Sequence, residues 1–213
     1  AYKINTAFYE SLGAKGWKAL EQTVNYIPET HFKIADAKRG DIGNTSDQYA
    51  KAFFETIPFD AITVAPYMGS DSVKPFLNYQ DKWTIVLGLT SNKGSEDFQQ
   101  RKIGDQFLYE EVIRRTSEWG TKGNLMFVVG ATKAAEISSI RKIIPDHFLL
   151  IPGVGAQGGS LSEVCKYGLN SEVGLLVNAS RAIIYAGKDE NFAEEARKVA
   201  RQYQTEMKSY LRE

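Results

Sequence analysis

The chain has 213 residues, enough for one sizeable hydrophobic core but not for two comfortable domains. Lysine and arginine together equal aspartate and glutamate at 26 each, so no net charge attracts nucleic acid or an anionic membrane. The single cysteine, Cys165, permits no intramolecular disulfide and fits a reducing compartment. Because the sequence shows no signal-peptide pattern and no apolar run of about 18 residues, we expect a cytoplasmic protein that does not contact membranes.

Apolar runs that alternate with amphipathic segments predict strands and helices in strict alternation. The predicted strands are 2–5, 32–36, 61–64, 83–89, 125–129, 148–151 and 173–177. The predicted helices are 17–27, 45–57, 71–79, 108–119, 134–143 and 192–210. The last helix is expected to bury Phe192, Ala196, Val199, Tyr203, Met207 and Tyr210.

The predicted strands are apolar throughout, which indicates a parallel sheet covered on both faces. A doubly wound open sheet and a closed (β/α)8 barrel both fit this pattern. The barrel needs eight units of about 30 residues each. One unit is lacking here, and the chain opens inside a strand at Ala1. We therefore expect that the natural protein has a first strand and helix that are missing from this chain.

Charge is concentrated directly after the second predicted strand. Asp36, Lys38 and Asp41 fall within six residues, and two glycines there allow the backbone to turn. Side chains alternate along a strand, so residues 36 and 38 point to the same side. A carboxylate and an ammonium group in that arrangement can keep each other charged in a dry pocket. A solvated loop with an ordinary ion pair fits the same residues.

Two later turns have features of an anion site. The turn Pro152–Gly159 is rich in glycine, which lets backbone N–H groups approach an anion, and Gln157 can add an amide donor. Asn178–Arg181 follows the next strand, and the planar guanidinium group of Arg181 matches a phosphate. Consecutive final βα loops hold phosphate in many barrels, so the pair predicts a phosphorylated ligand.

Other kinds of site have weaker support. No set of residues has the spacing of metal ligands, and no nucleophile elbow or dinucleotide fingerprint is present. His31 and His147 both precede apolar strands and are expected at the surface or at its boundary. Asp105, Glu110 and Glu111 are predicted to form a solvated helix start.

The order of these motifs resembles one family. Asp36–Thr45 resembles the signature of orotidine 5′-phosphate decarboxylase, in its longer bacterial-type subgroup. The other matching segments are Lys3–Asn5, Ala7–Glu10, Thr63–Gly69, Thr90–Asn92, Val129–Thr132, Pro152–Gly159 and Asn178–Arg181. The family's first strand carries an aspartate that contacts the ribose, and no such strand is present here. The resemblance implies a single α/β domain over residues 1–213, a (β/α)8 TIM barrel with parallel strands whose first βα unit is missing.

The resemblance also implies a reaction, the decarboxylation of orotidine 5′-monophosphate to uridine 5′-monophosphate without cofactor or metal. Asp36 is expected to lie against the substrate carboxylate, and Lys38 to protonate C6 as CO2 leaves. Lys3 and Asp41 are expected to complete the charge network.

The implied substrate contacts come from several loops. The residues expected to bind substrate are Asn5, Thr45, Ser91, Pro152, Gln157, Asn178 and Arg181. Within this set, Asn5 is expected near the ribose, together with Lys3, and Ser91 is expected at the pyrimidine edge. Gln157 and Arg181 are expected to hold the phosphate.

The resemblance further implies an obligate homodimer, in which Asp41 and Thr45 reach into the partner's site. Two alternatives remain open. One is a Mg²⁺-dependent sugar-phosphate decarboxylase or synthase of the same barrel group, which shares the Asp-x-Lys-x-x-Asp turn. The other is a non-catalytic protein that binds uridine nucleotides. Loss of activity with a chelator would favour the first alternative.

Overall fold

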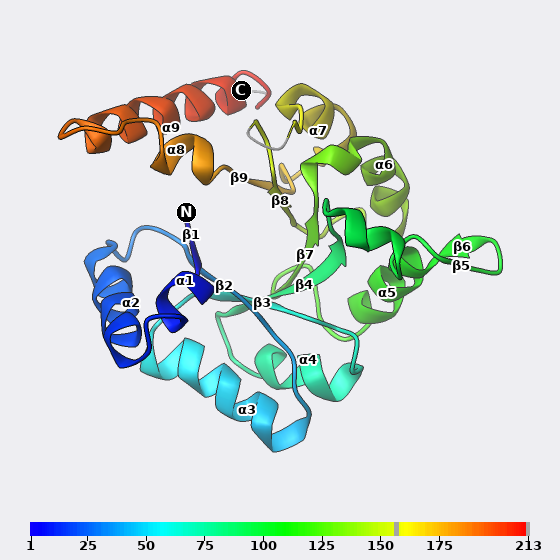
Figure 1. Ribbon diagram of the computed structural model, residues 1–213. Helices are drawn as coiled ribbons and strands as arrows, with labels where there is room; N and C mark the ends of the chain where they lie inside the picture. Colours follow the sequence, from blue (N-terminus) through cyan, green and yellow to red (C-terminus); the bar gives the residue numbers. More distant parts are fainter. Residues whose placement is uncertain (156–157, 212–213) are drawn as a thin grey trace. The chain divides into compact units, whose positions relative to one another are not determined.

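The computed structural model describes residues 1–155 and 158–211. Its main sheet has seven strands in the order β1-β2-β3-β4-β7-β8-β9 (Figure 1). The pairs β1–β2, β2–β3, β3–β4 and β8–β9 are all parallel, as the apolar strands predicted. The strands of this sheet are β1 Tyr2–Asn5, β2 Lys33–Arg39, β3 Ala61–Val64, β4 Trp83–Leu89, β7 Leu125–Val129, β8 Leu149–Pro152 and β9 Leu175–Asn178.

Helices connect these strands, and a small antiparallel hairpin stands apart from the main sheet. The α-helices are α1 Ala7–Glu10, α2 Ala14–Tyr26, α3 Gly43–Lys51, α4 Ser70–Leu77, α5 Leu108–Ser117, α6 Ala134–Ile143, α7 Leu161–Gly168, α8 Arg181–Ile184 and α9 Phe192–Lys208. The shorter elements are the π-helix η1 Ala52–Thr56, the 3-10 helices η2 Lys93–Glu96 and η3 Ala131–Lys133, and the hairpin strands β5 Lys102–Ile103 and β6 Gln106–Phe107. Within the described ranges, the helices include none that is long and apolar enough to cross a bilayer.

The chain divides into two compact units. The first unit comprises Ala1–Gly88 and Tyr109–Phe127, and the second comprises Leu89–Leu108 and Val128–Glu213.

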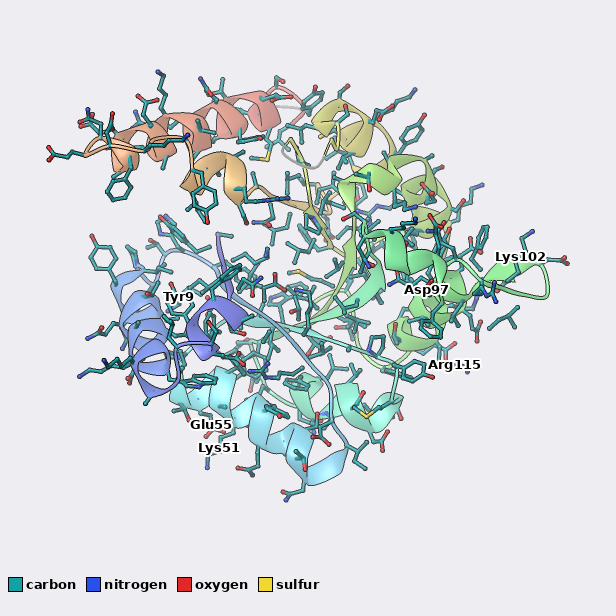
Figure 2. The ribbon with its side chains drawn as sticks, in the orientation of Figure 1. Tyr9, Lys51, Glu55, Asp97, Lys102 and Arg115 are labelled. Atoms are coloured by element: carbon teal, nitrogen blue, oxygen red, sulfur yellow. The ribbon has the colours of Figure 1, made fainter. Side chains whose placement is uncertain are left out.

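The first unit is built around aromatic side chains that pack between helices and strands. All four residues of β3 are buried, and the rings of Phe53 and Phe59 lie 6.0 Å apart. Helices α3 and α4 lie side by side (Figure 1). Lys51 and Glu55 point away from the strands, which leaves the apolar face of this helical segment for the core (Figure 2).

The second unit has an aliphatic core. Ile137 and Ile140 of α6 are fully buried, as are Leu149 and Ile151 of β8. Helices α6 and α7 lie side by side, and so do α8 and α9 (Figure 1). Strands β8 and β9 are in register from the pair Leu149–Leu175 to the pair Pro152–Asn178.

Several predicted elements are confirmed, and others need correction. Strand 83–89 and helix 134–143 have the predicted bounds. The second strand, by contrast, continues to Arg39 and not only to Asp36, so Lys38 also lies within the strand and not in a turn after it. Asp105 lies in the turn of the β5–β6 hairpin and not at a helix start. The hairpin was missed because two-residue strands are too short to show a period.

The prediction for the last helix was wrong about burial. No described residue of α9 is buried, and 57% of Phe192 is exposed. Strand β9 ends the strand order of the main sheet, and its four residues are also only half-buried. A terminal strand has a neighbour on one side only in the described chain, so the helices after it have less apolar surface to cover.

Arg141 of α6 joins several turns of the second unit. Its guanidinium group donates hydrogen bonds to five backbone carbonyls, those of Ile144, Pro145, His147, Gly168 and Gly174. Burial lowers the pKa of Arg141 to about 10, an effect that the nearby Asp146 carboxylate opposes. The group therefore stays charged at neutral pH, and it supplies donors to carbonyls at the ends of α6, α7 and the loop before β9.

We expect Arg141→Met to lower the free energy of unfolding by about 2–4 kcal/mol, because it leaves half-buried carbonyls without donors. Urea unfolding followed by circular dichroism measures this loss. Lys142→Met is a matched control, since the neighbouring Lys142 is exposed, and it is expected to change the same quantity by less than about 0.5 kcal/mol. Equal stabilities of the two variants would contradict the proposed role of Arg141.

Candidate active site

Three charged side chains of the first unit meet on the neighbouring strands β1 and β2. Lys3 Nζ lies 2.6 Å from Asp36 Oδ2, and Lys38 Nζ lies 2.5 Å from Asp36 Oδ1. The side chains of Lys3 and Asp36 are 9% and 11% exposed, whereas that of Lys38 is 51% exposed. A ligand from solvent can therefore reach the Lys38 ammonium group while the other two charges stay covered. The predicted proximity of residues 36 and 38 is confirmed.

The Asp36 carboxylate is held in its charged form. Burial by itself would raise the pKa of Asp36, but the charges and hydrogen bonds of Lys3 and Lys38 outweigh burial and leave the pKa below its usual range. A carboxylate with two cationic partners remains ionised at neutral pH. The site thus presents a fixed negative charge between two fixed positive charges.

The backbone at Lys38 is irregular. Its φ is +49°, a left-handed value that a lysine rarely adopts, and the register between β2 and β3 shifts between Ala35 and Arg39. The buried hydroxyl group of Thr63 on β3 accepts a hydrogen bond from Lys38 N at 2.9 Å and donates one to Asp36 Oδ1 at 3.2 Å. Sequence reasoning missed this role of Thr63. The available signals were a hydroxyl group in an otherwise apolar strand and the position of Thr63 at the start of a segment that resembles the family.

The other residues predicted near this cluster have local contacts. The Asp41 carboxylate accepts a hydrogen bond from Ile42 N at 2.8 Å. Asn5, which pairs in register with Asp36, accepts a hydrogen bond from Ala7 N at 3.1 Å through its side chain. Thr45 is exposed in the first turn of α3.

The remaining residues predicted to bind substrate, including those predicted to hold its phosphate, lie in the second unit. Pro152 and Asn178 end the neighbouring strands β8 and β9 and are paired in register. Arg181 is the exposed first residue of α8. Gln157 lies outside the described residues. Ser91 packs so closely against Gly130 that a Cβ atom at Gly130 would come within 2.7 Å of Ser91 Cβ.

The glycine-rich turn after β8 is compact in its described part. Gly155 N donates to Gly159 O at 3.1 Å, and Gly158 N donates to Gly155 O at 2.8 Å. The φ of Gly155 is +76°, a left-handed value that favours glycine, and a Cβ atom there would lie 2.2 Å from Tyr203 Oη. The turn therefore passes close to Tyr203 of α9.

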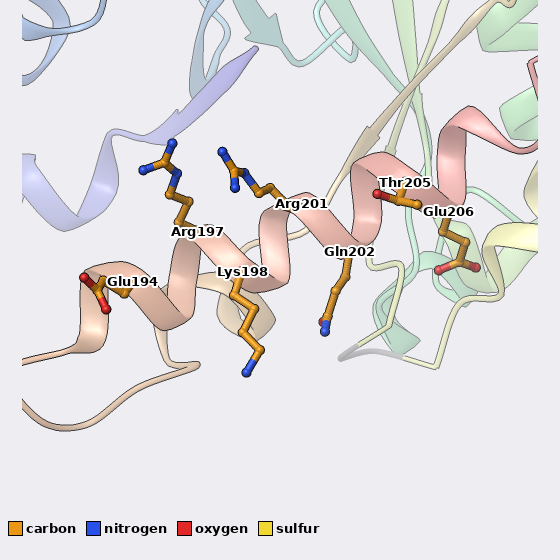
Figure 3. A pocket seen from close by; sticks show the side chains of 7 residues that line it. All are labelled: Glu194, Arg197, Lys198, Arg201, Gln202, Thr205 and Glu206. Carbon is orange, nitrogen blue, oxygen red and sulfur yellow. The ribbon is translucent and has the colours of Figure 1, made fainter.

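Two surface hollows elsewhere in the second unit are lined by none of the predicted site residues that the structure describes. One hollow is lined by α9 alone, and its lining residues are Glu194, Arg197, Lys198, Arg201, Gln202, Thr205 and Glu206 (Figure 3). Cys165 borders a second hollow, but burial raises the pKa of its thiol, which argues against a nucleophile. Across residues 1–155 and 158–211, no group of three or more His, Cys, Asp and Glu side chains could hold a metal ion.

Comparison with known proteins gives a consistent picture. A family model described as orotidine 5′-phosphate decarboxylase / HUMPS family matches residues 1–197. The chain is 59% identical over 215 residues to orotidine 5′-phosphate decarboxylase of Phocaeicola vulgatus, covering 99% of this chain and 79% of the relative. It is 60% identical over 209 residues to orotidine 5′-phosphate decarboxylase of Flavobacterium johnsoniae, and this match covers 97% of the chain and 77% of the relative.

Solved structures of related enzymes are also similar to this chain. The chain is 40% identical to Leishmania donovani OMP decarboxylase with a TM-score of 0.84, covering 93% of this chain and 77% of that one. The chain is 42% identical to Leishmania donovani UMP synthase with a TM-score of 0.87. The match covers 95% of this chain and 45% of the synthase. The predicted fold class, a parallel α/β fold of the (β/α)8 barrel type, is confirmed by this likeness. The chain belongs to the orotidine 5′-phosphate decarboxylase / HUMPS family.

Proposed function

We propose that this chain decarboxylates orotidine 5′-monophosphate to uridine 5′-monophosphate and CO2, the reaction of its relatives in pyrimidine synthesis. The observation that carries the proposal is the Lys3–Asp36–Lys38 cluster, in which alternating charges are fixed and only Lys38 is widely exposed. The relatives that are 58–60% identical over nearly the whole chain bear the name of this enzyme, which supports the assignment.

The chemistry needs a positive charge where a carbanion forms. In the proposed step the C6–carboxylate bond breaks, its electron pair stays on C6, and CO2 leaves. Lys38 stabilises the developing negative charge and then donates its Nζ proton to C6, which leaves a neutral amine. Asp36 lies against the departing carboxylate, and Lys3 keeps Asp36 in place. Because the charges are fixed beforehand, they can match the transition state better than the bound substrate.

The second unit is proposed to bind the phosphate of the substrate. Gln157 acts as a donor from the turn that begins at Pro152, and Arg181 from the turn that begins at Asn178. Ser91 reads the pyrimidine edge. Binding energy from this remote group can offset the cost of placing the substrate carboxylate near Asp36. We propose that both units form one catalytic domain over residues 1–213, because a single family model runs through both of them.

The Mg²⁺-dependent alternative is disfavoured, and a chelator distinguishes it from the proposed reaction. The description of the matching family model names HUMPS proteins beside orotidine 5′-phosphate decarboxylase. The family match alone therefore does not separate the decarboxylase from another enzyme of the same barrel group. The names of the relatives favour the decarboxylase. A non-catalytic nucleotide-binding protein is disfavoured by the intact lysine–aspartate cluster.

We propose a homodimer in which Asp41 and Thr45 reach the partner's site, with Asn5 near the ribose of its own site. Asp41 and Thr45 belong to the first unit, and Ile42 beside Asp41 is 55% exposed. An exposed isoleucine next to a half-buried aspartate is compatible with a surface that a second copy covers. The cytoplasmic location expected from the sequence stays a prediction.

The first prediction tests the reaction itself. Purified protein is expected to consume orotidine 5′-monophosphate, seen as a loss of ultraviolet absorbance, at the same rate with and without a chelator. Loss of turnover with the chelator and its return with Mg²⁺ would favour the alternative enzyme. Nucleotide binding without turnover would favour the non-catalytic alternative.

The second prediction concerns the proton donor. Lys38→Ala is expected to lower kcat by at least about 10³-fold, because it removes both the charge and the proton at C6. Binding of uridine 5′-monophosphate should remain detectable by calorimetry. Lys51→Ala is the control, since Lys51 is an exposed lysine on the outer side of α3 (Figure 2). Near-normal turnover by Lys38→Ala would exclude this donor.

The third prediction concerns shared sites. Subunits with Lys38→Ala and with Asp41→Ala are each expected to be inactive as homodimers. In a mixed dimer one site keeps both residues, so statistical exchange should restore about a quarter of wild-type activity. No recovery in a mixed dimer verified by mass spectrometry would show that Asp41 acts in its own subunit.

A further inference from the structure

The peptide unit between Ala37 and Lys38 is held at both of its polar groups. Its N–H, on Lys38, donates to Thr63 Oγ1 at 2.9 Å. Its carbonyl, on Ala37, accepts a hydrogen bond from Arg39 Nη1 at 3.1 Å. Because a peptide unit is planar, holding both groups determines its orientation and therefore limits φ at Lys38. This peptide is the one that leads into the left-handed residue of the cluster.

The Arg39 side chain is itself fixed from several elements. Its Nη2 donates to Glu10 Oε1 at 2.6 Å, and its guanidinium carbon lies 5.3 Å and 5.1 Å from the ring centres of Tyr49 and Phe53. The side chains of Arg39 and Glu10 are 18% and 28% exposed. The guanidinium group is thus enclosed by α1, α3 and η1 and cannot reorient freely.

The short helix that carries Glu10 is also held in place. Tyr9 of α1 shares a hydrogen bond with Thr23 of α2 at 3.3 Å between Oη and Oγ1. A Cβ atom at Gly16 would lie 1.7 Å from Tyr9 O, so α1 and α2 are in close backbone contact there. Glu10 therefore presents its carboxylate from a rigid position.

We propose that Arg39, held by Glu10, is a positioning residue for Lys38. By bonding to Ala37 O, it keeps the Ala37–Lys38 peptide in the orientation that directs the lysine side chain to Asp36. The proposal rests on the proposed function for its effect on turnover. Its structural content, the orientation of one peptide and the place of the Lys38 ammonium group, is independent of the substrate.

The planar fork of the guanidinium group is essential to this role. An ammonium group at the end of Arg39→Lys keeps the charge but cannot donate to Ala37 O and Glu10 Oε1 with a fixed geometry while stacked on the rings. Arg39→Lys should therefore behave like Arg39→Met in turnover. If Arg39 acted only through its positive charge, Arg39→Lys would keep the turnover that Arg39→Met loses.

The kinetic test compares Arg39→Lys and Arg39→Met with Arg115→Met. Arg115 is a suitable control because it is an exposed arginine of α5 that pairs with Glu111 and Glu118 on or next to its own helix (Figure 2). Both Arg39 variants are expected to lower kcat about 10- to 100-fold, as for a small misplacement of a reacting group, and to change KM less than about threefold. The control should match wild type. A kcat within about twofold of wild type in a folded Arg39→Met variant would overturn the proposal.

A second readout does not use activity. In a crystal structure of Arg39→Met, the Ala37–Lys38 peptide is expected to rotate and the Lys38 ammonium group to leave Asp36. Unchanged φ at Lys38 and an unchanged contact with Asp36 would refute the proposal even if turnover fell. Should Arg39→Met not fold, the same measurements on Arg39→Lys and Glu10→Gln decide the question. Failure of wild type to turn over orotidine 5′-monophosphate would refute the proposed function and leave this structural test intact.

Discussion

One nearly buried carboxylate, that of Asp36, constrains how the strands of the first unit pair. An ionised side chain that is 11% exposed is costly unless opposite charges compensate for lost hydration. Asp36 has two such partners, one from β1 and one from its own strand. The placement of Lys3 depends on the parallel register that sets Asn5 beside Asp36. Pairing shifted by one residue would turn Lys3 to the other face and leave the carboxylate short of one charge.

The same cluster explains why the second strand is irregular. A lysine with φ of +49° is strained, and such strain persists where surrounding contacts determine the conformation. Here the hydroxyl group of Thr63 and the guanidinium group of Arg39 hold opposite ends of one peptide. The strained residue is also the exposed one of the three charges, and therefore the one that a substrate can meet. The irregularity thus coincides with the proposed chemistry.

Two arginines illustrate how a planar donor is used for structure. Arg39 and Arg141 both donate to backbone carbonyls, and Arg39 also donates to the carboxylate of Glu10. Arg141 stabilises connections of the second unit, where removal is expected to affect stability. Arg39 lies one residue from the proposed proton donor, so its effect reaches the chemistry. A lysine with a single flexible ammonium group would suit neither position.

The local sequence pattern determined most of the secondary structure and part of the candidate site. Apolar runs and helical spacing predicted the parallel strands and most helices, and the period of a strand predicted that Asp36 and Lys38 share a side. Only the tertiary structure decided which distant groups meet them. Lys3 reaches Asp36 across 33 residues and Glu10 reaches Arg39 across 29, because strand register and helix packing bring them together. Burial of the last helix was likewise misjudged, since an amphipathic pattern shows which face can be buried, whereas the neighbouring elements decide whether it is covered.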